Sequence, residues 1–380
     1  MRQVIKCTII AVSVIAAGVQ SATAKPAGES AFAAKKIDGA ELRLVGNVPV
    51  AILTGTPEEI GRQHAELLAE PGKAMVEFPK RFAERFGVEA FWPLVTQAGN
   101  TLVSRAPKPH QQELVAIAAN SDITTDQLAV GNTLLELRRL GCSAVVVEPS
   151  RSKTGAPIFG RNFDFPTLGD LDKYSMVIVY RPEGKHAFAS IGFPGLVGVI
   201  SAMNDAGLAA GTLDVERSSD GSRKFNPAGE PLAFVFRRIM EECTTIDEAE
   251  KLLRSVKPTT WMNLTVCDRD GGATFEITPD HIERRNAEEG VLRCTNHFRC
   301  EGMSVGEECW RYDALDVHEL AGKVDVRDIQ MALDSANQGE MTLQTMVFEP
   351  RDLVLHLAIG KPPVSLNKME KIELAPLFEQ

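Results

Sequence analysis

The sequence lacks the features that mark nucleic-acid-binding or disulfide-built proteins. Its 380 residues include 41 Lys plus Arg against 51 Asp plus Glu, a net charge of −10, and no long basic cluster. A polyanion partner is therefore disfavoured, because such partners need a basic face. Seven cysteines are too few for a scaffold built from disulfides. Hydrophobic residues at 44% and charged residues at 24% are ordinary for a globular protein and exclude a wholly disordered chain.

Long hydrophobic runs are also missing after the N-terminus, so we expect a soluble mature chain with no membrane span. The N-terminus itself has the pattern of a signal peptide. Arg2 and Lys6 flank the start of the apolar run Cys7–Val19, and Ala22-Thr23-Ala24 is a small-residue cleavage site. We predict that residues 1–24 are removed and that the protein is exported to the periplasm or secreted. An uncleaved anchor helix is the alternative.

The chain after the signal peptide divides into two parts. Residues 25–141 are dominated by helical patterns, interrupted by prolines such as Pro71 and Pro79. A helix start is predicted at Thr56–Glu59, where Thr caps and Glu completes a capping box. Residues 142–380 contain short β-rich runs separated by Gly and Pro, which favours adjacent antiparallel strands. Since strands and helices do not alternate regularly, we predict an α+β fold rather than a parallel doubly wound sheet.

Metal-ligand motifs are scarce. The sequence contains neither CxxC nor HExxH. Cys294, His297 and Cys300 lie close together, but a structural zinc site needs four ligands and a fourth is not evident. We therefore expect no metal and no cofactor. Cys300 and Cys309 bracket a loop and are the best candidates for a disulfide, with a fully reduced set as the alternative.

One stretch matches the GxSxG pattern of a serine hydrolase, with Ser304 as the nucleophile. That elbow needs a strand that runs directly into a helix, so that the serine is exposed on a tight turn. Here the flanking residues have the polar composition of a loop, and no HGGG-like stretch is present for an oxyanion hole. The remaining triad members would be His318 or His356, with Asp313 or Asp316. A surface loop is the simpler interpretation.

Cys142 is another candidate nucleophile. A cysteine that enters a β-branched run is most often a small buried hydrophobe. Further along the chain, however, the run Gly160–Phe165 places charged residues in an apolar extended segment. Such charges are costly to bury unless they have a task. A structural ion pair on a sheet edge is the alternative. In an extended segment alternate residues share a face: Arg161 with Phe163, and Asn162 with Asp164.

These residues resemble the motifs of the linear amide C–N hydrolases of the N-terminal nucleophile superfamily. The branch that the sequence resembles most is the acyl-coenzyme A:6-aminopenicillanic acid acyltransferase type. The resemblance runs along most of the mature chain, in five further segments that occur in the same order. These are Gly55–Gly61 with His64, Met203–Leu208, Cys294–Phe298, Arg311-Tyr312 and Thr345–Pro350.

The resemblance implies a four-layer αββα sandwich and a precursor that cuts itself between Gly141 and Cys142. The cut would leave an α chain from segment 25–141 and a catalytic β chain from segment 142–380. It would free the α-amino group of Cys142, which titrates near pH 8 and can act as the base for the neighbouring thiol. No separate histidine is then needed. Gly141 suits a strained turn at the cut.

The resemblance also implies roles for individual residues. Asp164 would orient the Cys142 amine, and Arg161 would assist the nucleophile or contact substrate. Asn296 would donate into the oxyanion hole, Arg311 would support this arrangement, and Asp214 is a weaker candidate for contact with substrate.

The resulting hypothesis is an exported cysteine amidohydrolase or acyltransferase that acts on a linear amide through a Cys142 thioester. Its partners would be a small acyl amide, and in the transferase case an acyl-donor thioester. No nucleic acid is expected, and the α and β chains are expected to stay associated. The alternatives are a serine hydrolase that uses Ser304 and a non-catalytic exported binding protein.

Overall fold

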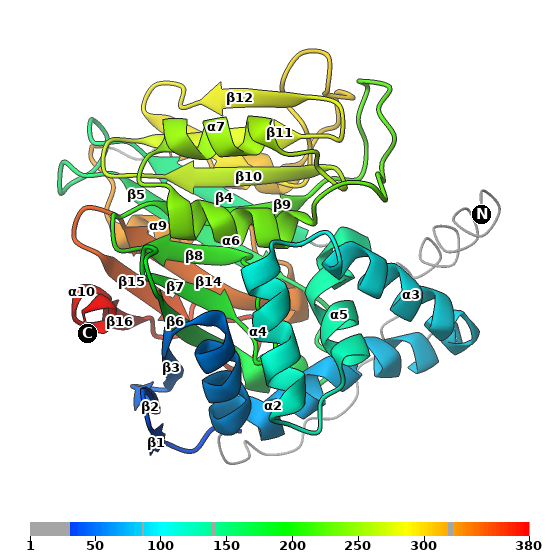
Figure 1. Ribbon diagram of the computed structural model, residues 1–380. Helices are drawn as coiled ribbons and strands as arrows, with labels where there is room; N and C mark the ends of the chain where they lie inside the picture. The colour runs from blue at the N-terminus through cyan, green and yellow to red at the C-terminus, as the bar shows by residue number, and fades with distance from the viewer. Residues whose placement is uncertain (1–30, 86, 138–140, 318–321, 380) are drawn as a thin grey trace.

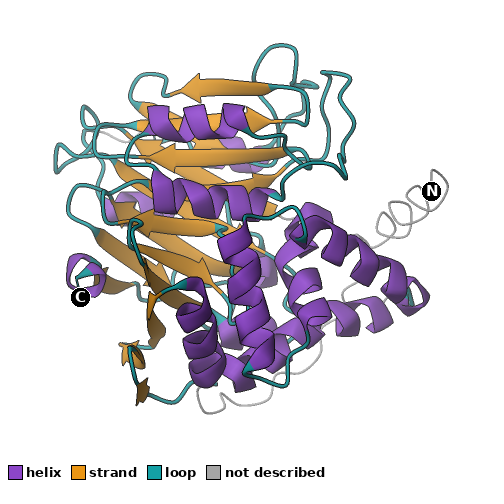
Figure 2. Cartoon of the chain, viewed as in Figure 1, coloured by secondary structure: helices purple, strands orange, loops and turns teal. Residues whose placement is uncertain are grey.

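The computed structural model describes residues 31–85, 87–137, 141–317 and 322–379. The predicted signal peptide, residues 1–24, lies outside these ranges. Within them, no helix is both long and apolar enough to cross a membrane. Figure 2 distinguishes the described helices and strands by colour. The helices are α2 (Pro57–Arg85), η1 (Glu89–Phe91), α3 (Trp92–Val103), α4 (Lys108–Ala119), α5 (Thr125–Thr133), η2 (Leu134–Leu137), η3 (Leu171–Tyr174), α6 (Leu232–Glu242), α7 (Ile246–Ser255), α8 (Trp310–Ala314), α9 (Val326–Ser335), η4 (Gly339–Met341) and α10 (Ala375–Phe378).

The described strands form two sheets. Sheet A has the spatial order β1-β2-β3-β6-β7-β8-β9-β10-β11-β12, and sheet B has the order β13-β4-β5-β14-β15-β16. The strands of sheet A are β1 (Lys35–Ile37), β2 (Ala40–Val45), β3 (Val48–Gly55), β6 (Met176–Pro182), β7 (Phe188–Gly192), β8 (Ser201–Asn204), β9 (Ala209–Asp214), β10 (Met262–Cys267), β11 (Gly272–Ile277) and β12 (Ile282–Asn286). Those of sheet B are β4 (Gly141–Val147), β5 (Ile158–Asp164), β13 (Val291–Cys294), β14 (Thr342–Glu349), β15 (Val354–Ala358) and β16 (Glu370–Glu373).

Three hydrophobic cores separate four layers. One core lies between the sheets and joins side chains such as Phe159 of sheet B to Val179 and Ile191 of sheet A. A second packs sheet A against α2, α6 and α7, which lie across its outer face in Figure 1. A third packs sheet B against α9. Both sheets are therefore covered on two faces, which explains the nearly continuous apolar strands. The α+β class and the αββα layering are confirmed.

The N-terminal segment is mainly helical, but it also supplies strands to sheet A. Its strand β3 pairs in parallel with β6, and Val50 is opposite Val177. The other strand pairs described in the two sheets are antiparallel. Helices α2, α4 and α5 share a core with Phe234 of α6. The N-terminal segment is thus built into the same body as the rest of the chain.

The start of α2 agrees with the prediction, whereas its length does not. The Glu59 carboxylate accepts a hydrogen bond from the Thr56 N–H at 2.8 Å, and the Thr56 hydroxyl accepts one from the Glu59 N–H. Helix α2 then continues through Pro71 and Pro79 to Arg85, although these prolines were expected to interrupt it. Both are buried, so packing of the helix outweighs the backbone hydrogen bond that each proline removes.

Candidate functional site

Cys142 lies near the start of β4, at the centre of the molecule. It is opposite Phe163 of β5 in the antiparallel register and is fully buried in the core between the sheets. Ala144 is opposite Arg161 in the same ladder, so Cys142, Arg161 and Phe163 share the face toward sheet A. Asn162 and Asp164 have the opposite orientation. The predicted division of β5 into two faces is confirmed.

Arg161 connects the two sheets at the thiol. Its Nη2 atom donates to the Cys142 Sγ at 3.4 Å, and the residue is fully buried. Gly211 in sheet A makes room for it, since a Cβ there would lie 2.8 Å from the Arg161 Cδ. The guanidinium also donates to acceptors of sheet A and the adjoining loop: the Ile200 carbonyl, the Ser201 hydroxyl at 2.6 Å and the Thr212 carbonyl at 2.5 Å. Its position beside the sulfur is therefore fixed on several sides.

Two opposing effects act on the Cys142 thiol. Burial raises its pKa, and the positive charge of Arg161 opposes that increase. Asp164 adds a smaller increase through its negative charge. The net effect is a raised pKa, so in the uncut chain the Cys142 thiol resists ionisation.

The main-chain groups of Cys142 are held from outside the strand. Its N–H donates to the Asn296 Oδ1 at 2.8 Å, and its carbonyl accepts from the Arg311 Nη1. Arg311 also donates through Nη2 to the Asn296 Oδ1 at 2.9 Å, which links the two holding residues. The Asn296 Nδ2 donates to the main-chain carbonyl of Asp214 at 2.7 Å. The structure therefore brings Asn296, Arg311 and Asp214 together with Cys142.

Asp164 lies at the other side of the proposed cut, opposite Gly141 in the ladder. Its carboxylate accepts from Gln338 at 2.8 Å and from Thr342 at 2.6 Å. Burial raises its pKa, and these hydrogen bonds partly oppose the increase. A Cβ on Gly141 would collide with the Gln338 amide nitrogen, so a larger residue at this position would displace the Gln338 side chain from Asp164. In the uncut chain the N–H of Cys142 is directed to Asn296, and the expected contact of Asp164 with a freed amine stays a prediction.

An apolar cavity of about 70 Å³ is lined in part by Phe163, which is opposite Cys142 in the ladder of β4 and β5. Its walls come from α2, the α5–η2 region, β5 and the loop between β7 and β8, and no charged side chain is among the described residues that line it. Representative wall residues are Phe78, Leu134, Phe163, Phe193, Leu196 and Ile200. A larger and more open hollow of about 560 Å³ lies beside α9 and includes none of the predicted site residues. Of the two hollows, the small cavity is the one that includes a residue paired with Cys142, namely Phe163.

The GxSxG stretch has a different environment. Ser304 lies in an irregular segment that ends at α8, and its hydroxyl accepts from the Gly306 N–H at 3.1 Å. No described strand leads into it. Of the predicted partners, His356 contacts the Glu349 carboxylate at 2.6 Å, and Asp316 pairs with Arg293. His318 lies outside the described residues. The described surroundings of Ser304 are those of a loop, not of a nucleophile elbow.

The six cysteines that the structure describes are free thiols, so the suggested Cys300–Cys309 bond is not formed. Burial alone would raise the pKa of Cys309, but hydrogen bonds from His297 and Thr295 lower it to about 6. Cys309 is therefore more readily ionised than Cys142 in the uncut chain. Among the described residues, no group of three or more Cys, His, Asp or Glu side chains is arranged to hold a metal ion.

Sequence reasoning missed the residues that hold the predicted ones in place. Gln338 and Thr342 hold Asp164, and Ser201 with the Thr212 carbonyl holds Arg161. None of them belongs to a charged motif, and each is distant in sequence from the residue that it holds. The pairing of β14 with β5, which places Thr342 opposite Asp164, could have indicated one of them, but the others depend on packing between elements that the sequence does not reveal.

One family model matches more than half of the chain. The family model described as acyl-coenzyme A:6-aminopenicillanic acid acyl-transferase matches residues 150–363. An uncharacterized protein of Archaeoglobus fulgidus is 22% identical, over 74% of this chain and 57% of that protein. Human acid ceramidase is 27% identical, over 41% of this chain and 43% of the enzyme. The chain therefore spans about half the length of the curated relatives that it matches.

Similar solved structures have lower identity. A variant of the conjugated bile acid hydrolase from Clostridium perfringens has a TM-score of 0.47 at 13% identity, and the match covers 63% of this chain and 95% of that chain. The N-acylethanolamine-hydrolyzing acid amidase orthologue from Caenorhabditis elegans has a TM-score of 0.45 at 15% identity, with 59% and 95% coverage.

Proposed function

Because the chain belongs to the acyl-coenzyme A:6-aminopenicillanic acid acyltransferase family, we propose that it is an exported, self-processing amidase or acyltransferase with Cys142 as its nucleophile. One observation carries the assignment. Arg161 donates a hydrogen bond to the sulfur of the fully buried Cys142, while Asn296 and Arg311 hydrogen-bond its main-chain N–H and carbonyl. Buried guanidinium groups beside one cysteine are costly unless they act on it.

The first proposed reaction is the cut itself. The Cys142 sulfur attacks the carbonyl carbon of Gly141, the C–N bond of that peptide breaks, and the proton lost by the thiol passes to the departing Cys142 nitrogen. Water then hydrolyses the resulting thioester, which gives a carboxylate at Gly141 and restores the thiol. Arg161 favours the thiolate form that this attack requires, and Asn296 holds the N–H of the departing nitrogen. Because the bond lies inside the fold, the cut is intramolecular.

The second proposed reaction uses the same sulfur on an external amide. The freed α-amine of Cys142, with an ordinary pKa of about 8, accepts the thiol proton and later passes it to the leaving amine. An acyl thioester remains on Cys142. Water completes a hydrolysis, whereas a second amine completes an acyl transfer. A donor such as the Asn296 Nδ2 stabilises the oxyanion, once its present bond to the Asp214 carbonyl is exchanged.

The substrate class follows from the surroundings of the sulfur. The adjoining cavity is apolar, so the acyl group that it accepts is a small apolar one. The amide nitrogen side lies toward Arg311 and Asp214, where polar groups are available. The preferred substrate is thus a linear amide of an apolar carboxylic acid. Export is part of the proposal and rests on the pattern of residues 1–24.

The test is the intact mass of the purified protein, with N-terminal sequencing of every fragment. We expect a β chain that begins at Cys142, an α chain that begins after Ala24, and an acyl adduct on Cys142 with a slow amide substrate. Cys142→Ala should stay uncut and inactive. Cys267→Ala is the matched control, because Cys267 is equally buried but lies in β10.

Peptide mapping must accompany the mass measurement. The pKa of the Cys309 thiol is lowered and that of Cys142 is raised, so we expect a thiol reagent to label Cys309 before Cys142 in the uncut chain. The total amount of label would therefore not identify the nucleophile. A single uncut chain with amidase activity, or activity retained by Cys142→Ala, would overturn the proposal.

A further inference from the structure

The loop of residues 193–200, which joins β7 to β8, is almost completely buried. Within it only Leu196 is partly exposed, and the other residues are buried. A buried loop is unusual, because each of its backbone N–H and C=O groups needs a partner that water would otherwise supply. Side chains from three helices supply several of these partners.

Asn132 of α5 provides most of them. Its Oδ1 atom accepts from the N–H groups of Val197 at 2.7 Å and Gly198 at 3.1 Å. Its Nδ2 atom donates to the carbonyls of Gly195 at 2.8 Å and Leu128 at 3.0 Å. The side chain is fully buried, and all four hydrogen bonds that an amide can make are in use. Asn132 thus fixes the middle of the loop by its backbone.

His64 of α2 and Arg237 of α6 complete the support. The His64 Nε2 accepts from the Gly195 N–H at 2.8 Å, so this ring nitrogen carries no proton. Burial lowers the pKa of His64 to about 4, which keeps the ring neutral. From the other side, the Arg237 Nη1 donates to the Val197 carbonyl at 3.1 Å.

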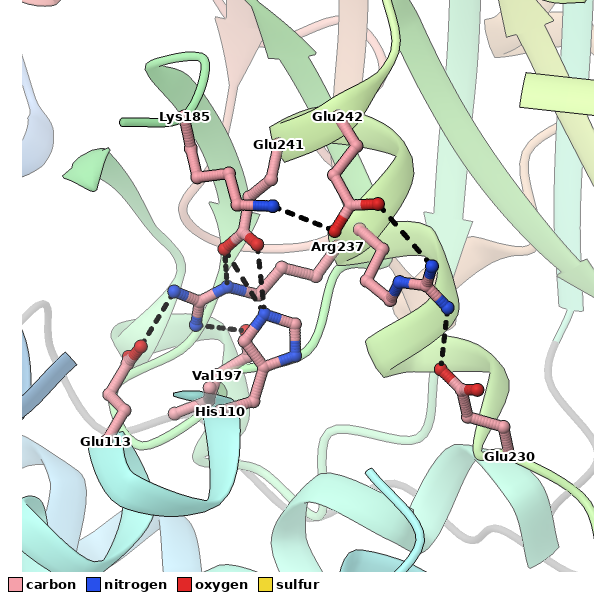
Figure 3. Close-up of polar contacts among 9 residues, drawn as sticks. His110, Glu113, Lys185, Val197, Glu230, Arg237, Glu241 and Glu242 are labelled. Carbon is pink, nitrogen blue, oxygen red and sulfur yellow. Dashed lines mark hydrogen bonds and ion pairs between the residues drawn. The ribbon is translucent and has the colours of Figure 1, made fainter. Parts of the chain in front are cut away.

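Arg237 is itself locked by buried charges. Figure 3 shows its guanidinium between two carboxylates, with the Val197 carbonyl at a third position. Nε donates to Glu241 at 2.8 Å, and Nη2 forms a 2.7 Å ion pair with Glu113 of α4. His110 contacts Glu241 at 3.1 Å. All four side chains are at most 7% exposed. A planar guanidinium held at both carboxylates cannot rotate, so its remaining N–H stays directed at the loop.

The supported loop reaches the candidate site in two ways. Phe193, Leu196 and Ile200 line the apolar cavity next to Phe163. The Ile200 carbonyl also accepts from Arg161, which contacts the Cys142 sulfur. A change in the backbone of the loop would therefore change the wall that faces the acyl group, and it would reach the nucleophile as well.

We propose that Asn132, His64 and Arg237 are positioning residues that set the shape of loop 193–200 and thereby select the acyl group of the substrate. This inference rests on the proposed function, since it assigns the cavity to the acyl side of the amide. Asn132 and His64 precede the proposed cut, whereas the loop and Arg237 follow it. The cut would therefore leave an acyl pocket with walls from both chains, in which loop 193–200 of one chain is supported partly by side chains of the other.

The test is the acyl-group preference of Asn132→Ala, measured with amides of one amine that carry straight-chain acyl groups from acetyl upward. We expect the ratio of kcat/KM between the best substrate and the acetyl amide to fall at least about tenfold, mainly through KM. Asn204→Ala is the matched control. Asn204 is also fully buried and makes three hydrogen bonds to backbone groups, but none of them is in the loop. It should lose stability and keep the wild-type ratio.

Two additions keep the result decisive. Asn132→Asp retains the Oδ1 acceptor for Val197 and Gly198 and loses the donations to Gly195 and Leu128, so it serves if the alanine variant does not fold, and its ratio should shift less. The second readout is the binding of the corresponding free carboxylic acids to the uncut Cys142→Ala chain and to its Asn132→Ala double variant by calorimetry. This readout needs no turnover, so it separates a failure of the proposed function from a failure of this inference. An unchanged ratio in both assays, an equal shift in Asn204→Ala, or no binding of any acid overturns the inference.

Discussion

Glu136 offers a direct test of the electrostatics near the proposed cut. It lies in η2, a few residues before Gly141, and is 5% exposed. Its Oε1 atom accepts from the N–H groups of Leu232 at 2.6 Å and Ala233 at 3.4 Å, at the N-terminus of α6. The other oxygen accepts from the Thr259 hydroxyl. Burial nevertheless raises the pKa of Glu136 from 4.5 to about 7, and these hydrogen bonds only partly oppose it.

The sign of the effect on stability follows from the direction of this change. A carboxyl group whose pKa is higher in the folded chain binds its proton more readily when folded. Its contribution to the free energy of unfolding is therefore greatest below pH 4.5, and it is lost as the pH rises through about 7. At about 1.4 kcal/mol per tenfold change in proton affinity, the loss is on the order of 3 kcal/mol. Glu136→Gln keeps the shape and the acceptor for α6 but has no charge to bury, so it should not show this loss.

The assay is urea unfolding from pH 4.5 to 8.5, in the Cys142→Ala chain so that the protein remains a single piece. We expect Glu136→Gln to gain stability over its parent on the order of 3 kcal/mol as the pH rises across this range. Other titrating groups cancel in the difference. Glu340→Gln, an exposed position, should change stability by no more than about 0.5 kcal/mol. A difference between Glu136→Gln and its parent that does not vary with pH would refute the reasoning.

Three further substitutions test the site. Gly141→Ala places a Cβ against Gln338, so the rate of self-cleavage should fall at least about tenfold in a gel time course. Adding Gln338→Ala to this variant should restore part of the rate. A wild-type rate in the single variant contradicts the steric argument. Ser304→Ala should keep amidase activity within about twofold, whereas its loss would favour the serine mechanism. In the processed fraction of Asn296→Ala, kcat should fall by a factor on the order of 10²–10³, with little change in KM. A kcat near the wild-type value would show that Asn296 is not a donor of the oxyanion hole.

The two faces of β5 could be predicted from local sequence, because strand periodicity is a local property, whereas Asn296, Arg311 and Asp214 were suggested only by the family resemblance. The alternation in Gly160–Phe165 predicted which residues of β5 share a face, and the register with β4 confirms it. The partners of these residues could not be predicted in this way. Asp164 is held by Gln338, 174 positions away, and only the assembled sheet brings them together. An uncharged glutamine carries no pattern that would reveal such a contact.

The helical segment shows a second limit of local reasoning. Pro71 and Pro79 locally disfavour a helix, yet α2 continues through both, because its apolar side chains pack against sheet A and against α4 and α5. The alternating stretch Glu41–Leu53 predicts a strand in the N-terminal segment, and β2 and β3 lie there, but local sequence does not reveal which strand pairs with β3. A strand such as β3 is completed only by pairing with β6, which follows more than a hundred residues later. Tertiary packing determines both features.

The parallel pairing of β3 with β6 also determines how the processed protein could refold. Val50 and Leu53 form a ladder with residues that lie beyond the Gly141–Cys142 bond. In the uncut chain this ladder closes within one molecule, at a rate that does not depend on protein concentration. If the bond is cut as proposed, the two partners become separate molecules, and restoring sheet A after denaturation becomes a second-order reaction. The proposed cut would thus make recovery after denaturation depend on protein concentration.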